Sequence, residues 1–140
     1  MVLARARGAR VVGGALMPVK WIAFKDSCRV TPGSLRLAAE LLFLAAECAP
    51  ELHGDTLIVT SLADGTEHKP GSMHYAGAAV DVRTHPNDDG SPRIGAIVGD
   101  VDATAARWAT AIRKRAGSGR QAMYERERKH LHIELDLEGE

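Results

Sequence analysis

The chain has 140 residues and a mass of 15.0 kDa, and its 18 Lys and Arg balance 18 Asp and Glu, so its formal net charge is zero. This length supports one compact domain, and a hydrophobic content of 45% is enough to bury a core. A neutral chain lacks the excess of Lys and Arg that binding to a phosphate backbone needs, so we expect no nucleic-acid partner. Its apolar stretches fall far short of the roughly 20 residues of a membrane helix, so we expect no membrane partner.

The N-terminus and the two cysteines say little about compartment. The first residues are basic and then briefly apolar, but they lack a small-x-small cleavage site, so we predict no signal peptide. We expect residues 1–16 to be a flexible extension, with Met17 as an alternative start, and residues 17–140 to form the domain. Cys28 and Cys48 form no CxxC pair, and two buried thiols are expected rather than a disulfide.

The first half of the chain predicts a strand, a helix and a second strand. Residues 20–24 are predicted to form a short strand or a segment that leads into the domain. Thr31 to Ser34 supply helix-start chemistry for a Leu- and Ala-rich helix over residues 35–49, which Pro50 ends. Residues 56–60, TLIVT, are β-branched and predict a buried strand.

A long polar loop separates this strand from the next one. Residues 61–77, SLADGTEHKPGSMHYAG, are too many for a simple turn, so they are a candidate functional loop. Residues 78–84 alternate as a strand does, and residues 85–93 are a loop by composition.

The last third of the chain predicts a helix and a closing strand. Asp100 or Asp102 caps a helix that runs to about Arg115 and ends at the glycines that follow. Residues 122–137 contain HLHIELDL and are interpreted as one closing strand. The order of elements predicts a single α+β domain with a small, mostly antiparallel sheet and helices packed on it.

Histidines suggest a metal site. His74 and Asp81 are seven residues apart, and His130 and His132 point to the same face if they lie on a strand. Two imidazoles and one carboxylate suit Zn²⁺ and leave its fourth tetrahedral position open to water. Either pattern alone is more typical of ordinary surface or core histidines. The flanking sequence must therefore distinguish these from metal ligands.

Residues 72–82 read SMHYAGAAVDV, and the H-x-H pair follows late in the chain. These motifs, S-x-H-x-x-G-x-A-x-D and H-x-H, resemble a zinc peptidase superfamily. That superfamily contains D-alanyl-D-alanine carboxypeptidases, phage L-alanyl-D-glutamate endopeptidases and the N-terminal signalling domain of Hedgehog proteins. The resemblance covers roughly residues 57–136 and is nearest to Hedgehog between His74 and Asp81.

The resemblance implies one zinc ion on the sheet face. It assigns three ligands: His74, Asp81 and His132. It implies that His130 lines the active site and stabilises the charged intermediate without binding metal. His68 and Ser72 are candidate substrate-binding residues, although a solvent-exposed loop histidine is an alternative for His68.

The resemblance also implies that the general base is an acid shortly before the last ligand, but Lys129 occupies one such position. Glu127 and Glu125 are the candidates, five and seven residues before His132, and proximity favours Glu127. Glu127 also precedes His130 by three residues, which keeps open a register in which His130 is the ligand. Tyr124 and Glu125 resemble a Tyr-Glu pair of Hedgehog domains. Both Glu residues lie an odd number of positions before His132, so a regular strand would point them to the opposite face from His132. A bulge or turn is needed to bring either Glu to the His132 face. The alternative is that residues 125–129, ERERK, form a solvated strand edge.

Many peptidoglycan members of the superfamily carry an Arg ahead of the first ligand that pairs with a substrate carboxylate. The corresponding stretch here, Val59 to Leu62, has none. Arg83 shares a strand face with Asp81 and is a candidate substitute for that Arg, but we expect it to be solvated at the surface.

The resemblance implies a zinc-dependent peptidase that hydrolyses a bond in peptidoglycan stem peptides, of carboxypeptidase or endopeptidase type. The alternative is a non-catalytic zinc-containing structural or binding module, such as part of a phage particle. Without a signal peptide, a wall-acting enzyme is expected to stay in the cytoplasm until release or to belong to a virion, which suggests a phage or prophage origin and a larger phage assembly as partner.

Overall fold

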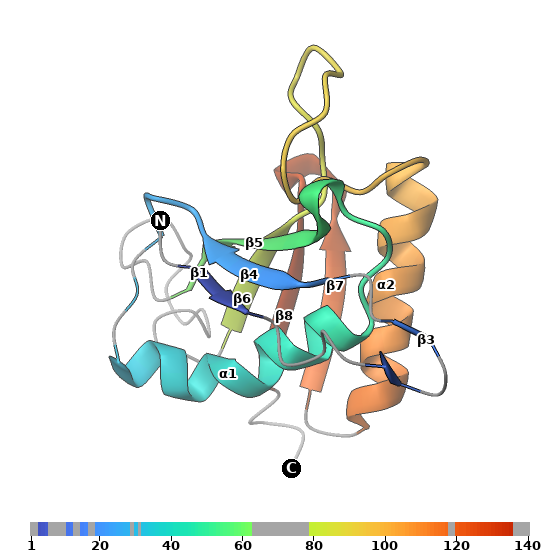
Figure 1. The fold of residues 1–140 in the computed structure, drawn as a ribbon. Coiled ribbons are helices and arrows are strands. Elements are labelled where there is room, and N and C mark those ends of the chain that lie inside the picture. Colours follow the sequence, from blue (N-terminus) through green and yellow to red (C-terminus); the bar gives the residue numbers. More distant parts are fainter. Residues whose placement is uncertain are drawn as a thin grey trace.

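A six-stranded sheet with two helices packed on it forms the centre of the protein (Figure 1). The computed structural model describes residues 3–5, 11–12, 15–16, 19–28, 30, 32–62, 79–117 and 120–135. In spatial order the strands are β1 (Leu3–Arg5), β4 (Trp21–Phe24), β5 (Thr56–Ser61), β6 (Ala79–Arg83), β8 (His130–Leu135) and β7 (Arg120–Glu125). Only β4 and β5 are parallel neighbours, so the predicted α+β class with a mostly antiparallel sheet is confirmed.

The N-terminal residues add short strands. β1 lies inside the stretch predicted as an extension, and it pairs with β4 at the edge of the sheet. β2 (Val11–Val12) and β3 (Ala15–Leu16) form a separate two-stranded ribbon. The boundary at residue 17 stays a prediction.

Two helices pack on one face of the sheet. α1 (Pro32–Glu47) provides the crossover that the parallel pair β4 and β5 requires, and it begins with a proline, which suits a first helical position. α2 (Val101–Ala116) is capped by Asp100, whose carboxylate accepts a hydrogen bond from the Ala103 amide at 3.1 Å, as one of the two predicted caps. The buried Trp108 indole donates to the Ala45 carbonyl at 3.0 Å and joins the two helices. Neither helix, nor any other in the described ranges, is long and apolar enough to cross a membrane.

The single closing strand predicted for residues 122–137 is wrong, because the structure has a hairpin there. β7 and β8 are joined by the 3₁₀ turn η2 (Arg126–Arg128) and by Lys129, whose φ of 59° is left-handed. The turn contains no Gly, Pro or Asn, the residues that normally mark a hairpin in sequence. Its consequence is that Glu125 pairs directly with His130.

Strand alternation separates the core from the opposite face of the sheet. Leu131 and Ile133 of β8, with Val80 and Val82 of β6, belong to the hydrophobic core shared with the helices. Residues between them must point the other way. We call this other face the site face; it carries Asp81, Arg83, His130, His132 and Glu134. The cysteines, Cys28 and Cys48, are half-buried and not bridged to each other.

The loop after β6 folds back against the sheet. A 3₁₀ turn, η1 (His53–Asp55), precedes β5, and its His53 exchanges backbone hydrogen bonds with residues 95 and 96 of the loop. Gly95 has a φ of +88°, and a Cβ there would lie 2.4 Å from Ile58 Cγ1. Only glycine allows this close approach of the loop to β5.

Gly95→Ala is expected to destabilise the protein more than Gly90→Ala. Both glycines have positive φ, so each substitution costs about 1 kcal/mol of backbone strain. Only the Cβ at position 95 collides with β5, because nothing lies within 4 Å of a Cβ at position 90, and the collision should cost roughly 1–3 kcal/mol more. Urea unfolding of both variants measures this difference, and equal losses would contradict it.

Candidate metal centre

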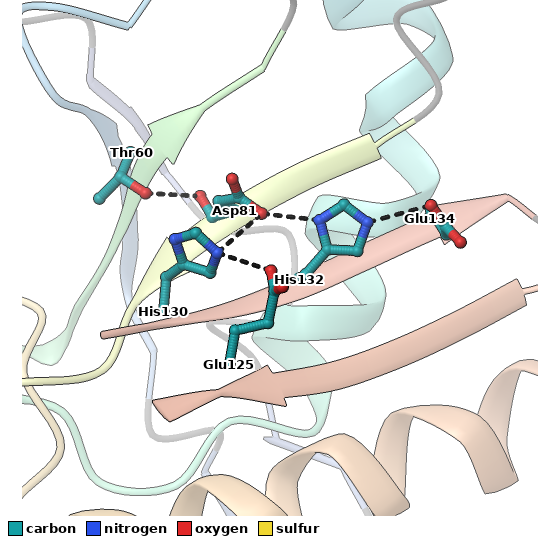
Figure 2. Close-up of polar contacts among 6 residues, drawn as sticks. All are labelled: Thr60, Asp81, Glu125, His130, His132 and Glu134. Carbon is teal, nitrogen blue, oxygen red and sulfur yellow. Dashed lines mark hydrogen bonds and ion pairs between the residues drawn. The ribbon is translucent and has the colours of Figure 1, made fainter. Parts of the chain in front are cut away.

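A buried carboxylate lies at the middle of the site face. Asp81 of β6 is only 2% exposed, and its direct cross-strand neighbour on β8 is His132. Its Oδ1 atom lies 2.8 Å from His132 Nδ1 and 3.6 Å from His130 Nε2, and Figure 2 draws both contacts as dashed lines. Burying a carboxylate is costly unless positive or hydrogen-bonding groups face it, so the two imidazoles stabilise the buried charge.

His132 lies between two carboxylates. Its Nε2 atom is 3.0 Å from Glu134 Oε2, on the opposite side of the ring from Asp81 (Figure 2). Burial favours the neutral ring, but the hydrogen bonds and charges of Asp81 and Glu134 outweigh it and raise the pKa of His132 to about 9. Without a metal ion the ring is therefore an imidazolium at neutral pH and donates from both nitrogens.

Glu125 completes the cluster from β7. It is the direct cross-strand neighbour of His130, and its Oε1 atom is 2.8 Å from His130 Nε2. The turn η2 reverses the chain between them and brings Glu125 to the site face. Glu127 lies on η2 itself and is exposed.

These residues fit a divalent cation. Asp81, Glu125 and His132 each offer one ligand atom, and the three atoms lie within 4.8 Å of one another. Imidazole nitrogen and carboxylate oxygen are donors that Zn²⁺ and similar ions accept. A cation that takes the Nδ1 atom of His132 replaces a proton there and leaves the Nε2–H group donating to Glu134, an arrangement common around protein-bound zinc.

The structure brings four of the predicted site residues together. They are Asp81, Glu125, His130 and His132. Glu127, preferred from the sequence as the base, is not among them. His68, Ser72 and His74 lie outside the described residues. Glu134 was not predicted, although its position two residues after His132 on an alternating strand places it on the same face.

A cavity of about 310 Å³ opens beside Asp81 and His130. Thr60 and Ser61 of β5 also line it, where the register of β5 against β6 shifts between Val59 and Ser61. This irregularity directs two successive β5 residues toward Asp81, and the Thr60 hydroxyl donates to the Asp81 backbone carbonyl at 3.3 Å.

Arg83 is not the solvated surface residue that the sequence suggested. It lines the cavity, and its Nη1 atom donates to the Ile94 carbonyl at 2.9 Å. Burial and the nearby Arg93 both lower the pKa of the guanidinium. The loop after β6 therefore holds Arg83 against the cavity wall, which no local sequence pattern indicates.

His85, in the loop after β6, has different surroundings from His130 and His132. His85 stacks on Tyr124 with ring centroids 6.1 Å apart, and Tyr124 donates to Asp102 of α2. Burial lowers the pKa of His85, and although Asp102 opposes this, Lys129 and other cations add to it. His85 thus belongs to the packing between the hairpin and α2, not to the metal cluster.

Comparisons with known proteins found no match: no family model, no curated protein and no solved structure resembles this chain closely enough to report.

We predict that the pKa values of His132 and His85 are shifted in opposite directions in chelator-treated protein. The pKa of His132 should be about 9, and that of His85 should lie below the ordinary value of 6.5. A raised pKa means that the ion pairs of His132 stabilise the fold fully below about pH 6.5 and stop doing so as the pH rises through about 9. For His85, stability falls as the pH drops below about 6.5. Imidazole ¹⁵N NMR measures both pKa values, and a His132 that titrates at or below its ordinary value would contradict the cluster.

Proposed function

We propose that this chain is a zinc-dependent hydrolase acting on a peptide bond of peptidoglycan stem peptides. The observation that carries the proposal is the packing of His132 and Glu125 around the buried Asp81, and the sequence motif names Asp81 and His132 as ligands. The motif supplies the third ligand, His74, and the substrate class. When bound, zinc supplies a Lewis acid for the scissile carbonyl and lowers the pKa of water.

Glu125 is the proposed general base. Its carboxylate is held by the His130 imidazole at 2.8 Å, which fixes its orientation toward the cluster. From there an Oε atom can accept a proton from water and return it to the leaving amine. His130 is proposed to stabilise the negative charge that develops on the carbonyl oxygen.

Glu134 is proposed as a positioning residue for His132. It accepts a hydrogen bond from the Nε2 side of the ring and so keeps Nδ1 directed toward Asp81 and the metal.

Replacing Glu125 should separate catalysis from metal binding. Glu125→Gln keeps the shape and the hydrogen bond to His130 but removes the base, so turnover should fall about 100-fold or more while one zinc ion per chain is retained. Peptide release from purified cell wall, followed by mass spectrometry, measures turnover, and metal analysis measures zinc.

The matched control is Glu127→Gln, which makes the same chemical change on the exposed turn η2 and should leave turnover near that of the wild type. Equal losses in both variants would contradict the assignment to Glu125. The proposed function would be overturned if the wild-type protein bound no zinc and the His132→Ala variant had the same metal content as the wild type.

Glu134→Gln should weaken zinc binding by about 10- to 100-fold, because the carboxylate that accepts a hydrogen bond from His132 Nε2 and orients the ring is lost. Competition with a chromogenic chelator measures the affinity. Glu51→Gln changes an exposed acid outside the cluster and serves as the control. Unchanged affinity in Glu134→Gln would show that this carboxylate does not position the ligand.

A second candidate function is a zinc-stabilised binding or structural module, for example within a phage particle. It is favoured by the position of Glu125, whose carboxylate lies close enough to Asp81 and His132 to be a metal ligand itself. A cation held by His74, Asp81, His132 and Glu125 would have four protein ligands and no open position, which is typical of structural zinc. In that case Glu125→Gln would lower zinc affinity and thermal stability, and the wild type would release no peptide.

A further inference from the structure

Positive charge collects in the cavity beside the metal cluster, although the whole chain is neutral. Five cationic residues line it, from four different segments: Lys25, Arg83, Arg93, Arg128 and Lys129. Asp81 is the one carboxylate among the described lining residues, and it already faces two histidines. Positive charges gathered in one cavity repel one another, so such a cluster is unfavourable unless an anion offsets it.

Most of these cations lack an acidic partner. Lys129 forms an ion pair with Asp88 at 2.6 Å. Within the ranges that the structure covers, no Asp or Glu pairs with the other four, which are Lys25, Arg83, Arg93 and Arg128. The positive charge of these four side chains therefore exceeds the single negative charge of Asp81.

The two central arginines are held in place by backbone carbonyls. Arg83 donates from Nη1 to Ile94, and Arg93 donates from Nε to His85 at 3.1 Å. These bonds use one donor of each guanidinium and leave the others for a ligand. Among the described atoms, Arg83 Nε is buried without a hydrogen-bond partner, and such an orphaned donor is costly unless a ligand or water satisfies it.

We propose that this cavity binds an oxyanion group carrying at least two negative charges, either a phosphate group or a pair of carboxylates. Guanidinium forks match the oxygen pairs of both groups, and Lys25 and Arg128 add charge at the rim. The inference rests on the proposed function only in placing the ligand's reacting bond at Asp81 and His130, which lie on the cavity wall. The substrate then carries a dianionic group next to the bond that is cut.

The test uses the full chain, freed of metal, at low ionic strength. Inorganic phosphate, glutarate and acetate are titrated by calorimetry. We expect phosphate or glutarate to bind at least about tenfold more tightly than acetate, because two charges meet the cluster, and added salt should weaken the binding. Tighter phosphate binding indicates a phosphorylated ligand, and tighter glutarate binding indicates a ligand with two carboxylates.

Charge-removing variants locate the binding. Lys25→Gln and Arg128→Gln should each weaken the preferred anion by about tenfold, as loss of a charge-assisted contact does. Lys114→Gln and Arg107→Gln remove the same charges from the exposed side of α2 and should leave binding unchanged. Arg83→Lys, which keeps the charge but loses the fork, should weaken binding less than Arg83→Gln.

Binding of acetate as tight as that of phosphate and glutarate, or equal losses in the α2 controls, would overturn the anion site. Because metal-free protein is used, the outcome is separate from that of the proposed function. Zinc binding without anion binding would rule out only the proposed anion site. Anion binding without zinc binding would rule out only the proposed metal-dependent function.

Discussion

The buried carboxylate of Asp81 is the constraint around which the site face is arranged. It has almost no contact with water, so its charge depends on His132 at 2.8 Å and on His130 nearby. The same strand pairing that supplies these imidazoles also packs Leu131 and Ile133 into the core. A one-residue slip of β8 would exchange the two sets of side chains, so burial of the core and assembly of the site select the same register.

Charge is segregated across the site although the chain as a whole is neutral. Three carboxylates surround the histidines: Asp81, Glu125 and Glu134. On the other side of Asp81 and His130, the cavity is lined by lysines and arginines. The proposed metal lies at one end and the proposed anion at the other, so a substrate with a coordinating carbonyl and an anionic group would match both proposals. Net charge alone indicates neither preference.

Glu125 decides between the two proposed functions, because one geometry serves both. Its hydrogen bond to His130 fixes the carboxylate before any ligand arrives, which suits a general base that must not reorganise. Its closeness to Asp81 and His132 also suits a fourth ligand, which would close the coordination sphere. Under the proposed hydrolase function the carboxylate would have to face water, and under the proposed structural function it would face the metal.

The sequence by itself determined the α+β class, both helices, a cap at Asp100 or Asp102 and the strand face shared by His130 and His132, and the structure selects Asp100 as the cap. These features depend on local periodicity and capping, which neighbouring residues fix. Tertiary structure decided which glutamate joins the cluster, because a hairpin turn without turn residues reverses the chain after Glu125. It also decided that Arg83 lines a cavity, because Gly95 lets a distant loop pack closely against β5. Contacts between segments far apart in the chain leave no periodic pattern, so only the folded structure shows them.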